Sequence, residues 1–228
     1  MQQEALRVLA GNRLTAGMTE KELAEFVSSS QVQLRDFGQG EYIFEDGERP
    51  ERLYILVRGA VRILKNTASG REILITEITE PGDMFGEVYL FIARQAYDMS
   101  AEALKTTRVL AISNAMFSLE QGGLAHISTL LLQNLLRIFA SKAYFMNNKL
   151  KVLASGSLRG KIVRYLFQLP AKDDRLQLPG SREELAAYLA VTRPSLSREL
   201  GAMQAEGMLE VQGRTVRILD TDAFERYL

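Results

Sequence analysis

The feature that most constrains this chain is a long stretch, residues 124–153, that contains neither glycine nor proline. These two residues disfavour a helix interior most strongly, so their absence here predicts one long helix. Seven apolar or small residues within it recur at alternating spacings of four and three, which is the pattern of a coiled-coil seam. They are Leu132, Leu136, Phe139, Ala143, Met146, Leu150 and Leu153.

The same helix carries a second apolar face beside the seam, formed by Leu131, Leu135, Ile138 and Phe145. A helix that is apolar on two sides needs two surfaces to pack against. We predict that the second face packs on the domain that precedes the helix, and that the seam meets the same helix of a second subunit. A single core helix buried within a monomer is the alternative.

The region before the helix, about residues 36–119, has a different texture. Short alternating apolar runs such as Tyr54–Val57 are separated by glycines, which recur every 7 to 12 residues between Gly40 and Gly82. Sequences such as Glu45-Asp46-Gly47 are typical of turns, because glycine adopts positive φ readily. This pattern predicts an antiparallel β barrel or sandwich.

The region after the helix predicts a winged helix-turn-helix. Residues 158–169 have helical periodicity and Pro170 ends them, while Ser181 begins a capping box with Glu184. A break at residues 190–192 separates that helix from another that begins at Arg193. Two short alternating runs, 208–211 and 215–219, then form a small hairpin, which is the expected wing.

The first turns of the helix at Arg193 are the candidate DNA-reading surface. Arginine can bind guanine O6 and N7 with two hydrogen bonds, and hydroxyl side chains can bind phosphates or bases. An arginine at the tip of the wing would hold a phosphate. The predicted DNA-binding residues are Thr192, Arg193, Ser195, Ser197, Arg198, Ser181 and Arg214.

Composition narrows the possible functions. The 228 residues include 28 Lys plus Arg and 28 Asp plus Glu, so any attraction to DNA must come from a local surface. From residue 157 onward, 11 basic residues face 10 acidic ones, a net charge of only +1. With no cysteine and one histidine, His126, the chain offers no thiolate metal site, iron–sulfur cluster or nucleophile–base pair. We expect a cytoplasmic protein that is not an enzyme, with no catalytic or metal site.

Several motifs, taken in order, resemble the CRP/FNR family of bacterial transcription regulators. They are Gly40-Glu41, Glu45-Asp46-Gly47, Arg58-Gly59, Pro81-Gly82-Asp83-Met84-Phe85-Gly86-Glu87, Arg159-Gly160-Lys161-Ile162 and Thr192–Arg198. The resemblance implies an α+β fold with an N-terminal antiparallel β-roll (double-stranded β-helix) sensor domain, residues 1–122. A dimerisation helix, 123–154, and a winged helix-turn-helix domain, 155–228, would follow. It also implies a homodimer on a two-fold symmetric DNA site, a small-molecule effector and, for an activator, contact with RNA polymerase.

The effector pocket departs from the family's cyclic-nucleotide pattern. That pattern has Gly-Glu, here Gly86-Glu87, and then an Arg-Ser pair whose arginine neutralises the cyclic phosphate. Tyr97 and Asp98 stand at that pair, and an aspartate would repel a phosphate. We therefore expect an effector other than cyclic AMP, bound between β-roll and helix, unless a shifted loop lets Arg94 compensate. The predicted pocket residues are Gly86, Glu87, Tyr97, Asp98, Ser100, Tyr144, Asn147 and Asn148.

Two alternatives stay open. The protein can be a haem-dependent gas or redox sensor of the same family, since haem iron accepts His, Met or Tyr ligands and His126, Met84 and Met146 are available. It can also be a cyclic-nucleotide-type sensor module that regulates a protein partner without binding DNA.

The recognition helix departs from the cyclic-AMP-responsive members in one position, where Pro194 replaces a glutamate.

Overall fold

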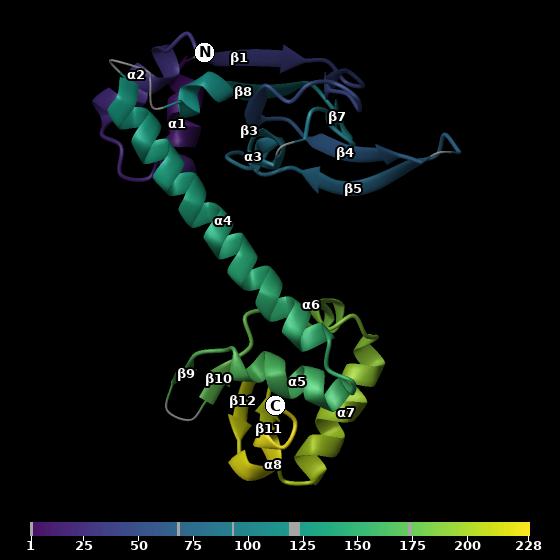
Figure 1. Ribbon diagram of the computed structural model, residues 1–228. Coiled ribbons are helices and arrows are strands. Elements are labelled where there is room, and N and C mark those ends of the chain that lie inside the picture. Colours follow the sequence, from purple (N-terminus) through teal and green to yellow (C-terminus); the bar gives the residue numbers. More distant parts are fainter. Residues whose placement is uncertain (1, 68, 93, 119–123, 173–174) are drawn as a thin grey trace. The chain divides into compact units, whose positions relative to one another are not determined.

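The computed structural model describes residues 2–67, 69–92, 94–118, 124–172 and 175–228 (Figure 1). Contacts divide the chain into two compact units, Met1–Phe139 and Ala140–Leu228. The division falls within the long helix α4 (Ala125–Leu153), which confirms the helix that the glycine- and proline-free stretch predicts. No helix among the described residues is long and apolar enough to cross a bilayer.

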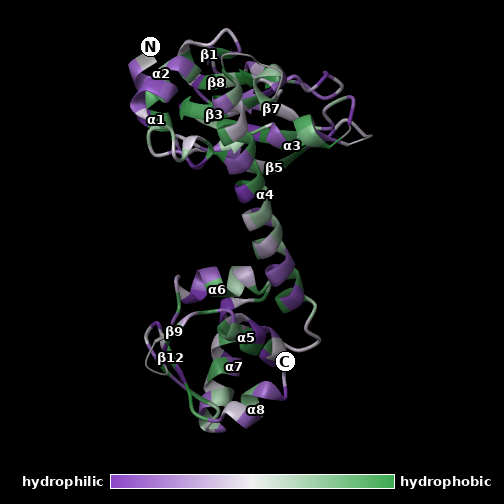
Figure 2. Ribbon diagram, turned by 60° about the vertical axis from the view of Figure 1, so that its left-hand side comes forward, coloured by the Kyte–Doolittle hydropathy of each residue, from purple (hydrophilic) through white to green (hydrophobic). Residues whose placement is uncertain are grey.

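Two antiparallel four-stranded sheets form the β-roll of the first unit. One has the order β1 (Val32–Phe37), β8 (Thr107–Ser113), β3 (Arg52–Arg58) and β6 (Met84–Phe85); the other has the order β2 (Tyr42–Phe44), β7 (Ser100–Ala103), β4 (Val61–Asn66) and β5 (Glu72–Ile78). Figure 2 shows hydrophobic residues along β3 and β8, which pair with each other over most of β3. The predicted antiparallel β architecture is confirmed.

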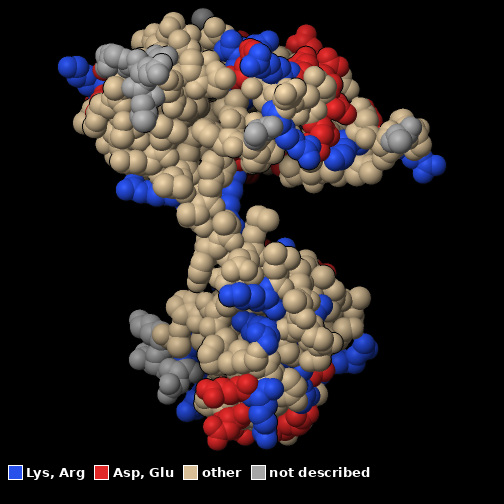
Figure 3. All heavy atoms as spheres, in the orientation of Figure 1, with Lys and Arg blue, Asp and Glu red and all other residues tan. Residues whose placement is uncertain are grey.

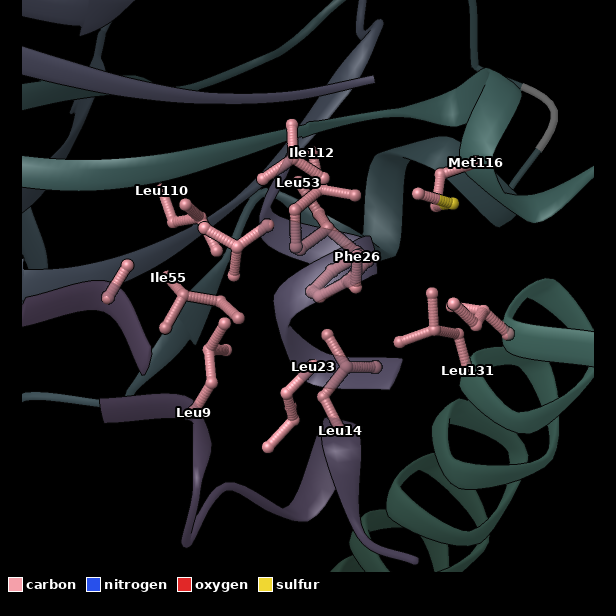
Figure 4. Close-up of a cluster of buried hydrophobic side chains, with 14 of the residues drawn as sticks. Leu9, Leu14, Leu23, Phe26, Leu53, Ile55, Leu110, Ile112, Met116 and Leu131 are labelled. Atoms are coloured by element: carbon pink, nitrogen blue, oxygen red, sulfur yellow. The ribbon is translucent and has the colours of Figure 1, made fainter. Parts of the chain in front are cut away.

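Helices at the N-terminus build a second core against the outer side of β3 and β8. They are α1 (Gln2–Leu9), the 3-10 turn η1 (Arg13–Thr15) and α2 (Glu20–Ser28). Leu9, Leu14 and Phe26 meet Leu53, Ile55, Leu110 and Ile112 of the sheet and Leu131 of α4, all of them buried (Figure 4). The sequence analysis did not predict these helices, although Thr19 and Glu22 form a capping box at the start of α2.

The second apolar face of α4 packs largely as predicted. Leu131, Leu135 and Ile138 are buried in the core of the first unit, and the Asn134 amide donates hydrogen bonds to the carbonyls of Leu14 and Ala16. Phe145 was expected to join them, and this is wrong. It is 68% exposed and belongs to the second unit, because the packed part of this face ends with Ile138.

The second unit contains α5 (Leu158–Phe167), β9 (Ala171–Lys172), β10 (Arg175–Gln177), α6 (Arg182–Tyr188), α7 (Arg193–Ala205), β11 (Leu209–Gln212), β12 (Thr215–Ile218) and α8 (Thr221–Glu225). The predicted helices and hairpin are confirmed, and β9 and β10 extend the hairpin into a four-stranded sheet, order β11-β12-β10-β9, that was not predicted. Val152, at the end of α4, is fully buried in the core of this unit together with Leu189 and Leu196.

The remaining short elements frame the candidate effector region. Helix α3 (Glu87–Phe91) begins directly after Gly86, and the 3-10 turn η2 (Asn114–Phe117) follows β8.

Candidate nucleic-acid interface and effector site

Local interactions fix the start of α7, the predicted recognition helix. Thr192 is its N-cap and its hydroxyl accepts a hydrogen bond from the Ser195 amide at 3.3 Å, while Pro194 occupies the first turn, where it is tolerated. Ala190 in the preceding turn has φ of 54°, so the chain turns sharply between α6 and α7. Buried Leu196 anchors the inner side of the helix.

The outer side of this first turn presents the predicted basic and hydroxyl side chains. Arg193, Ser197 and Arg198 are exposed and Ser195 is half-buried. Arg198 Nη2 donates to Ser195 Oγ at 3.3 Å, and the Thr192 and Ser195 hydroxyl oxygens lie 2.9 Å apart. Arg193 lies 3.6 Å from the Glu183 carboxylate, but both side chains are exposed and such a pair is weak. Both guanidinium groups are therefore accessible to a ligand.

The acidic residues of the recognition helix are engaged on its other side. Arg159, on α5, donates to Glu199 at 2.6 Å and to both oxygens of Glu206 at 2.6 and 2.9 Å. These contacts lower the pKa of Glu206. Figure 3 shows basic and acidic side chains mixed on the visible face of this unit. Arg159 therefore offsets one of the two negative charges of Glu199 and Glu206, and the exposed Arg193 and Arg198 supply the local positive charge at the start of α7.

Ser181 and Arg214 are the two other predicted DNA contacts; Ser181 lies at the start of α6 and Arg214 between the strands of the wing. Ser181 is exposed and caps α6, accepting from the Glu184 amide at 3.2 Å, so the predicted capping box is confirmed. Backbone and side-chain hydrogen bonds from Ser181 lower the pKa of Glu184, and the charge of Arg214 lowers it further. Arg214 is exposed between β11 and β12, and its carbonyl accepts from the Leu178 amide at 2.8 Å.

The predicted seam residues of α4 differ in burial along the helix. Leu136, Met146 and Leu150 are 69%, 65% and 63% exposed, and Ala143 is exposed. Leu132 and Phe139 are half-buried against the core of the first unit, and Leu153 is half-buried. A row of exposed large apolar side chains on one helix indicates a missing partner surface.

Aromatic rings line up in the candidate effector region of the β-roll. Tyr97 is buried, stacks on Phe44 with ring centroids 3.9 Å apart, and meets Tyr89 edge-on at 4.9 Å. Burial raises the pKa of Tyr97 well above its usual range. Gly86 has φ of +75° at the start of α3, and a Cβ there would lie 3.2 Å from the Tyr54 ring.

Asp98 does not stand free in this region. Its carboxylate accepts hydrogen bonds from the Tyr89 hydroxyl and from Lys65 Nζ at 3.1 Å, and Arg94 Nη1 lies 2.7 Å away. The hydrogen bond from Tyr89, together with Lys65 and Arg94, lowers the pKa of Asp98 to about 2. The two cations closest to this position are therefore paired with a carboxylate of the protein itself.

The other predicted pocket residues fall into both units. Glu87 is buried, and buried Ser100 accepts a hydrogen bond from the Asp46 amide at 3.0 Å. Tyr144, Asn147 and Asn148 lie on the part of α4 that belongs to the second unit, where the Asn148 carbonyl accepts from Gln168 at 3.2 Å. Their role toward an effector stays a prediction.

The haem alternative receives no support from the candidate ligands. His126 is 73% exposed, and its Nε2 lies 3.0 Å from the Glu22 carboxylate. Met146 is exposed, and Met84 packs against the core of the first unit. The described residues contain no cluster of His, Cys, Asp or Glu that could hold a metal ion. The haem alternative stays a prediction.

Sequence reasoning missed Lys65, Tyr89 and Arg159. Lys65 and Asp98 are 33 residues apart and meet only because strands of the sheet pair with each other. No spacing pattern in the sequence predicts this contact. Arg159 lies within one of the family motifs, but its carboxylate partners follow 40 and 47 residues later.

Comparisons with known proteins match both units. Residues 34–118 match the family described as "Cyclic nucleotide-binding domain", and residues 160–227 match "Crp-like helix-turn-helix domain". The chain is 31% identical over 199 residues to the transcriptional regulator LdrP of Thermus thermophilus, covering 85% of this chain and 95% of that protein. The chain belongs to the CRP/FNR family. This CRP/FNR protein is accordingly a transcriptional regulator and not an enzyme.

Two further comparisons, with a relative and with a solved structure, support membership of the CRP/FNR family. The CRP-like cAMP-activated global transcriptional regulator of Mycobacterium tuberculosis is 29% identical over 207 residues, covering 87% of this chain and 89% of that protein. The crystal structure of the catabolite activator protein of Thermus thermophilus matches with a TM-score of 0.51 and 25% identity, over 95% of this chain and 98% of that chain. The family resemblance and the α+β fold that it implied are confirmed.

Proposed function

We propose that this protein is a homodimeric, sequence-specific DNA-binding transcription regulator, switched by a small effector other than cyclic AMP. The observation that carries the proposal is the start of α7, where Arg193 and Arg198 are exposed beside the hydroxyls of Thr192, Ser195 and Ser197. In a winged helix-turn-helix this turn enters the major groove.

The two arginines would read guanines, and the hydroxyl groups would bind bases or phosphates. Ser181 at the start of α6 and Arg214 between the wing strands would hold the phosphate backbone on either side. Pro194 has no hydrogen-bonding side chain, so we expect no base-specific contact from it. The pairing of Glu199 and Glu206 with Arg159 supports this proposal, because it offsets part of the negative charge that would repel the approaching phosphates.

Dimerisation through α4 would bury the exposed apolar row. Leu136, Met146 and Leu150 follow the heptad spacing, and a second copy of the same helix is the partner that such a seam fits. A two-fold dimer would place two α7 helices on half-sites about one turn of DNA apart, roughly 10–10.5 base pairs.

For the effector, we propose only its chemical class and its binding region. Asp98 stands where the family's cyclic-nucleotide pattern has its Arg-Ser pair, and it is bonded to Lys65, Arg94 and Tyr89, which supports an effector other than cyclic AMP. We propose that the effector binds between the β-roll and α4, near Gly86, Glu87 and Tyr97, and changes the seam near Ala143–Leu150.

The experiment selects DNA that binds the full-length protein from a random library and then titrates the enriched sequence. Arg198→Ala should weaken binding by ~1–3 kcal/mol, about 5- to 150-fold, and relax the preference for one base, because a bidentate guanine contact is lost. Arg226→Ala is the matched control, since Arg226 is exposed at the end of α8, and its variant should bind like the wild type.

The selection also decides the proposal as a whole. Failure to enrich any sequence would contradict DNA reading and favour the alternative of a sensor that regulates a protein partner. Equal losses for Arg198→Ala and Arg226→Ala would contradict the role of α7. Cyclic AMP added to the titration should leave the affinity unchanged.

A further inference from the structure

A pocket of about 580 Å³ opens on the surface of the first unit, between the β2–β3 connection, the end of α3 and η2. Its walls include Arg49 and Pro50, Ile92, Arg94 and Gln95, and Asn114. None of these residues belongs to the set predicted for the effector site at Gly86, Glu87, Tyr97, Asp98 and Ser100. The volume lies within the ~300–1,000 Å³ typical of small-molecule sites.

The polar groups of this pocket favour an anion. Two guanidinium groups, Arg49 and Arg94, line it together with the amides of Gln95 and Asn114, and no acidic side chain lines it among the described residues. Within the described part of the chain, the Arg49 side chain makes no ion pair or hydrogen bond, so its five donors are available. Arginine binds carboxylate and phosphate groups through paired hydrogen bonds.

The rest of the wall is apolar. Pro50, which is buried, and Ile92, an exposed aliphatic side chain, both line the pocket. A ligand with a short hydrocarbon or ring portion would cover these groups while its charged end meets the arginines. We propose that this pocket binds a small organic anion, a carboxylate or a phosphate ester, between Arg49 and Arg94.

Binding there would act on the Asp98 cluster. Arg94 Nη1 is 2.7 Å from the Asp98 carboxylate, and Tyr89, which also lines the pocket, donates to the same carboxylate. An anion that attracts Arg94 competes with Asp98 for it and changes the attachment of α3 to β4 and β7. The ligand site itself stands independently of the proposed DNA binding; only a consequence for DNA affinity rests on that proposal.

The test is isothermal titration calorimetry on the full-length protein without DNA, using phenyl phosphate and benzoate as probes and benzyl alcohol as the neutral comparison. We expect at least one of the anions to bind and benzyl alcohol not to bind. Arg49→Gln should weaken binding roughly tenfold or more, because a charge-assisted hydrogen-bonded pair is lost. Arg71→Gln is the matched control, an exposed arginine on the β4–β5 connection, and should stay within about twofold of the wild type.

Three results would overturn the site. They are no heat of binding from either anion, an equal loss of affinity in Arg49→Gln and Arg71→Gln, and unchanged affinity in Arg49→Gln. A thermal melt of each variant checks that it is folded, and the exposed positions of Arg49 and Arg71 make that the expected result. Because no DNA is present, failure of the anion to bind leaves the DNA-binding proposal untouched. Failure of the protein to bind DNA likewise leaves the anion site untouched.

Discussion

Asp98 is the residue at which the β-roll departs from the family's cyclic-nucleotide pattern. A carboxylate here gathers Lys65, Arg94 and Tyr89 from β4, the loop after α3 and α3 itself. The sequence analysis predicted that Asp98 would oppose a phosphate. It could not predict Lys65 as a partner, because that contact depends on the packing of strands far apart in the chain.

The pKa of Asp98 makes this cluster testable through pH. The pKa falls from 3.8 to about 2 on folding, so the ionised carboxylate stabilises the fold fully above pH ~4 and loses this effect as the pH falls toward 2. We predict that Asp98→Asn lowers the urea midpoint of the first unit at pH 7. The difference from the wild type should shrink between pH 4 and pH 2. A difference that stays constant over this range would contradict the ionic origin.

Gly59 is a second residue whose identity the backbone dictates. Its φ is +106°, and a Cβ would lie 2.4 Å from Thr107 Oγ1 and 2.6 Å from Thr107 Cα. We predict that Gly59→Ala destabilises the protein by ~2–5 kcal/mol through strain and overlap with the backbone.

Gly47 provides the control for that substitution, because its φ is +90° but no atom lies within 4 Å of a Cβ. Gly47→Ala should therefore cost only the strain of positive φ, about 1–3 kcal/mol. Urea unfolding of both variants measures the difference. Equal free energies of unfolding would show that the close approach to Thr107 contributes nothing.

At the scale of helices and strands, the sequence predicts an element correctly where neighbouring residues in the chain stabilise it. The cap at Ser181 and the hairpin around Gly213 involve residues within a few positions of one another, and the sequence predicts both. Helices α1 and α2 and strands β9 and β10 are short, and they are stabilised by packing on distant residues such as Leu53 and Val216. Periodicity over so few residues is a weak signal, so these elements were missed.

The exposed apolar residues of helix α4 allow a test of the proposed dimer. Leu150→Glu places a charge in the proposed seam, and we expect it to shift the protein toward monomer in sedimentation velocity at micromolar concentration, because burying that charge is costly. Leu219→Glu is the control, since Leu219 is another half-exposed leucine, after β12 and outside the seam. A Leu150→Glu variant that remains dimeric would contradict the seam, and a wild type that is monomeric would contradict the dimer itself.

At the scale of the whole molecule, the sequence predicts the order of the parts better than their joints. The β-roll, the long helix and the winged helix-turn-helix domain follow the predicted order, and the two matched families cover residues 34–118 and 160–227. The boundary predicted after residue 154 stays a prediction, and the contacts divide the two units within α4, after Phe139. The reason is that Val152 packs into the core of the second unit, which joins the end of α4 to that unit.

We propose that two copies of this chain bind one symmetric DNA site through their α7 helices. Native mass spectrometry of the protein with its selected duplex counts the chains in that complex. We predict a complex of two 25.6 kDa chains with one duplex, and no complex with a single chain when the protein is in excess. One chain per duplex under these conditions, or no complex with the selected DNA, would contradict the account.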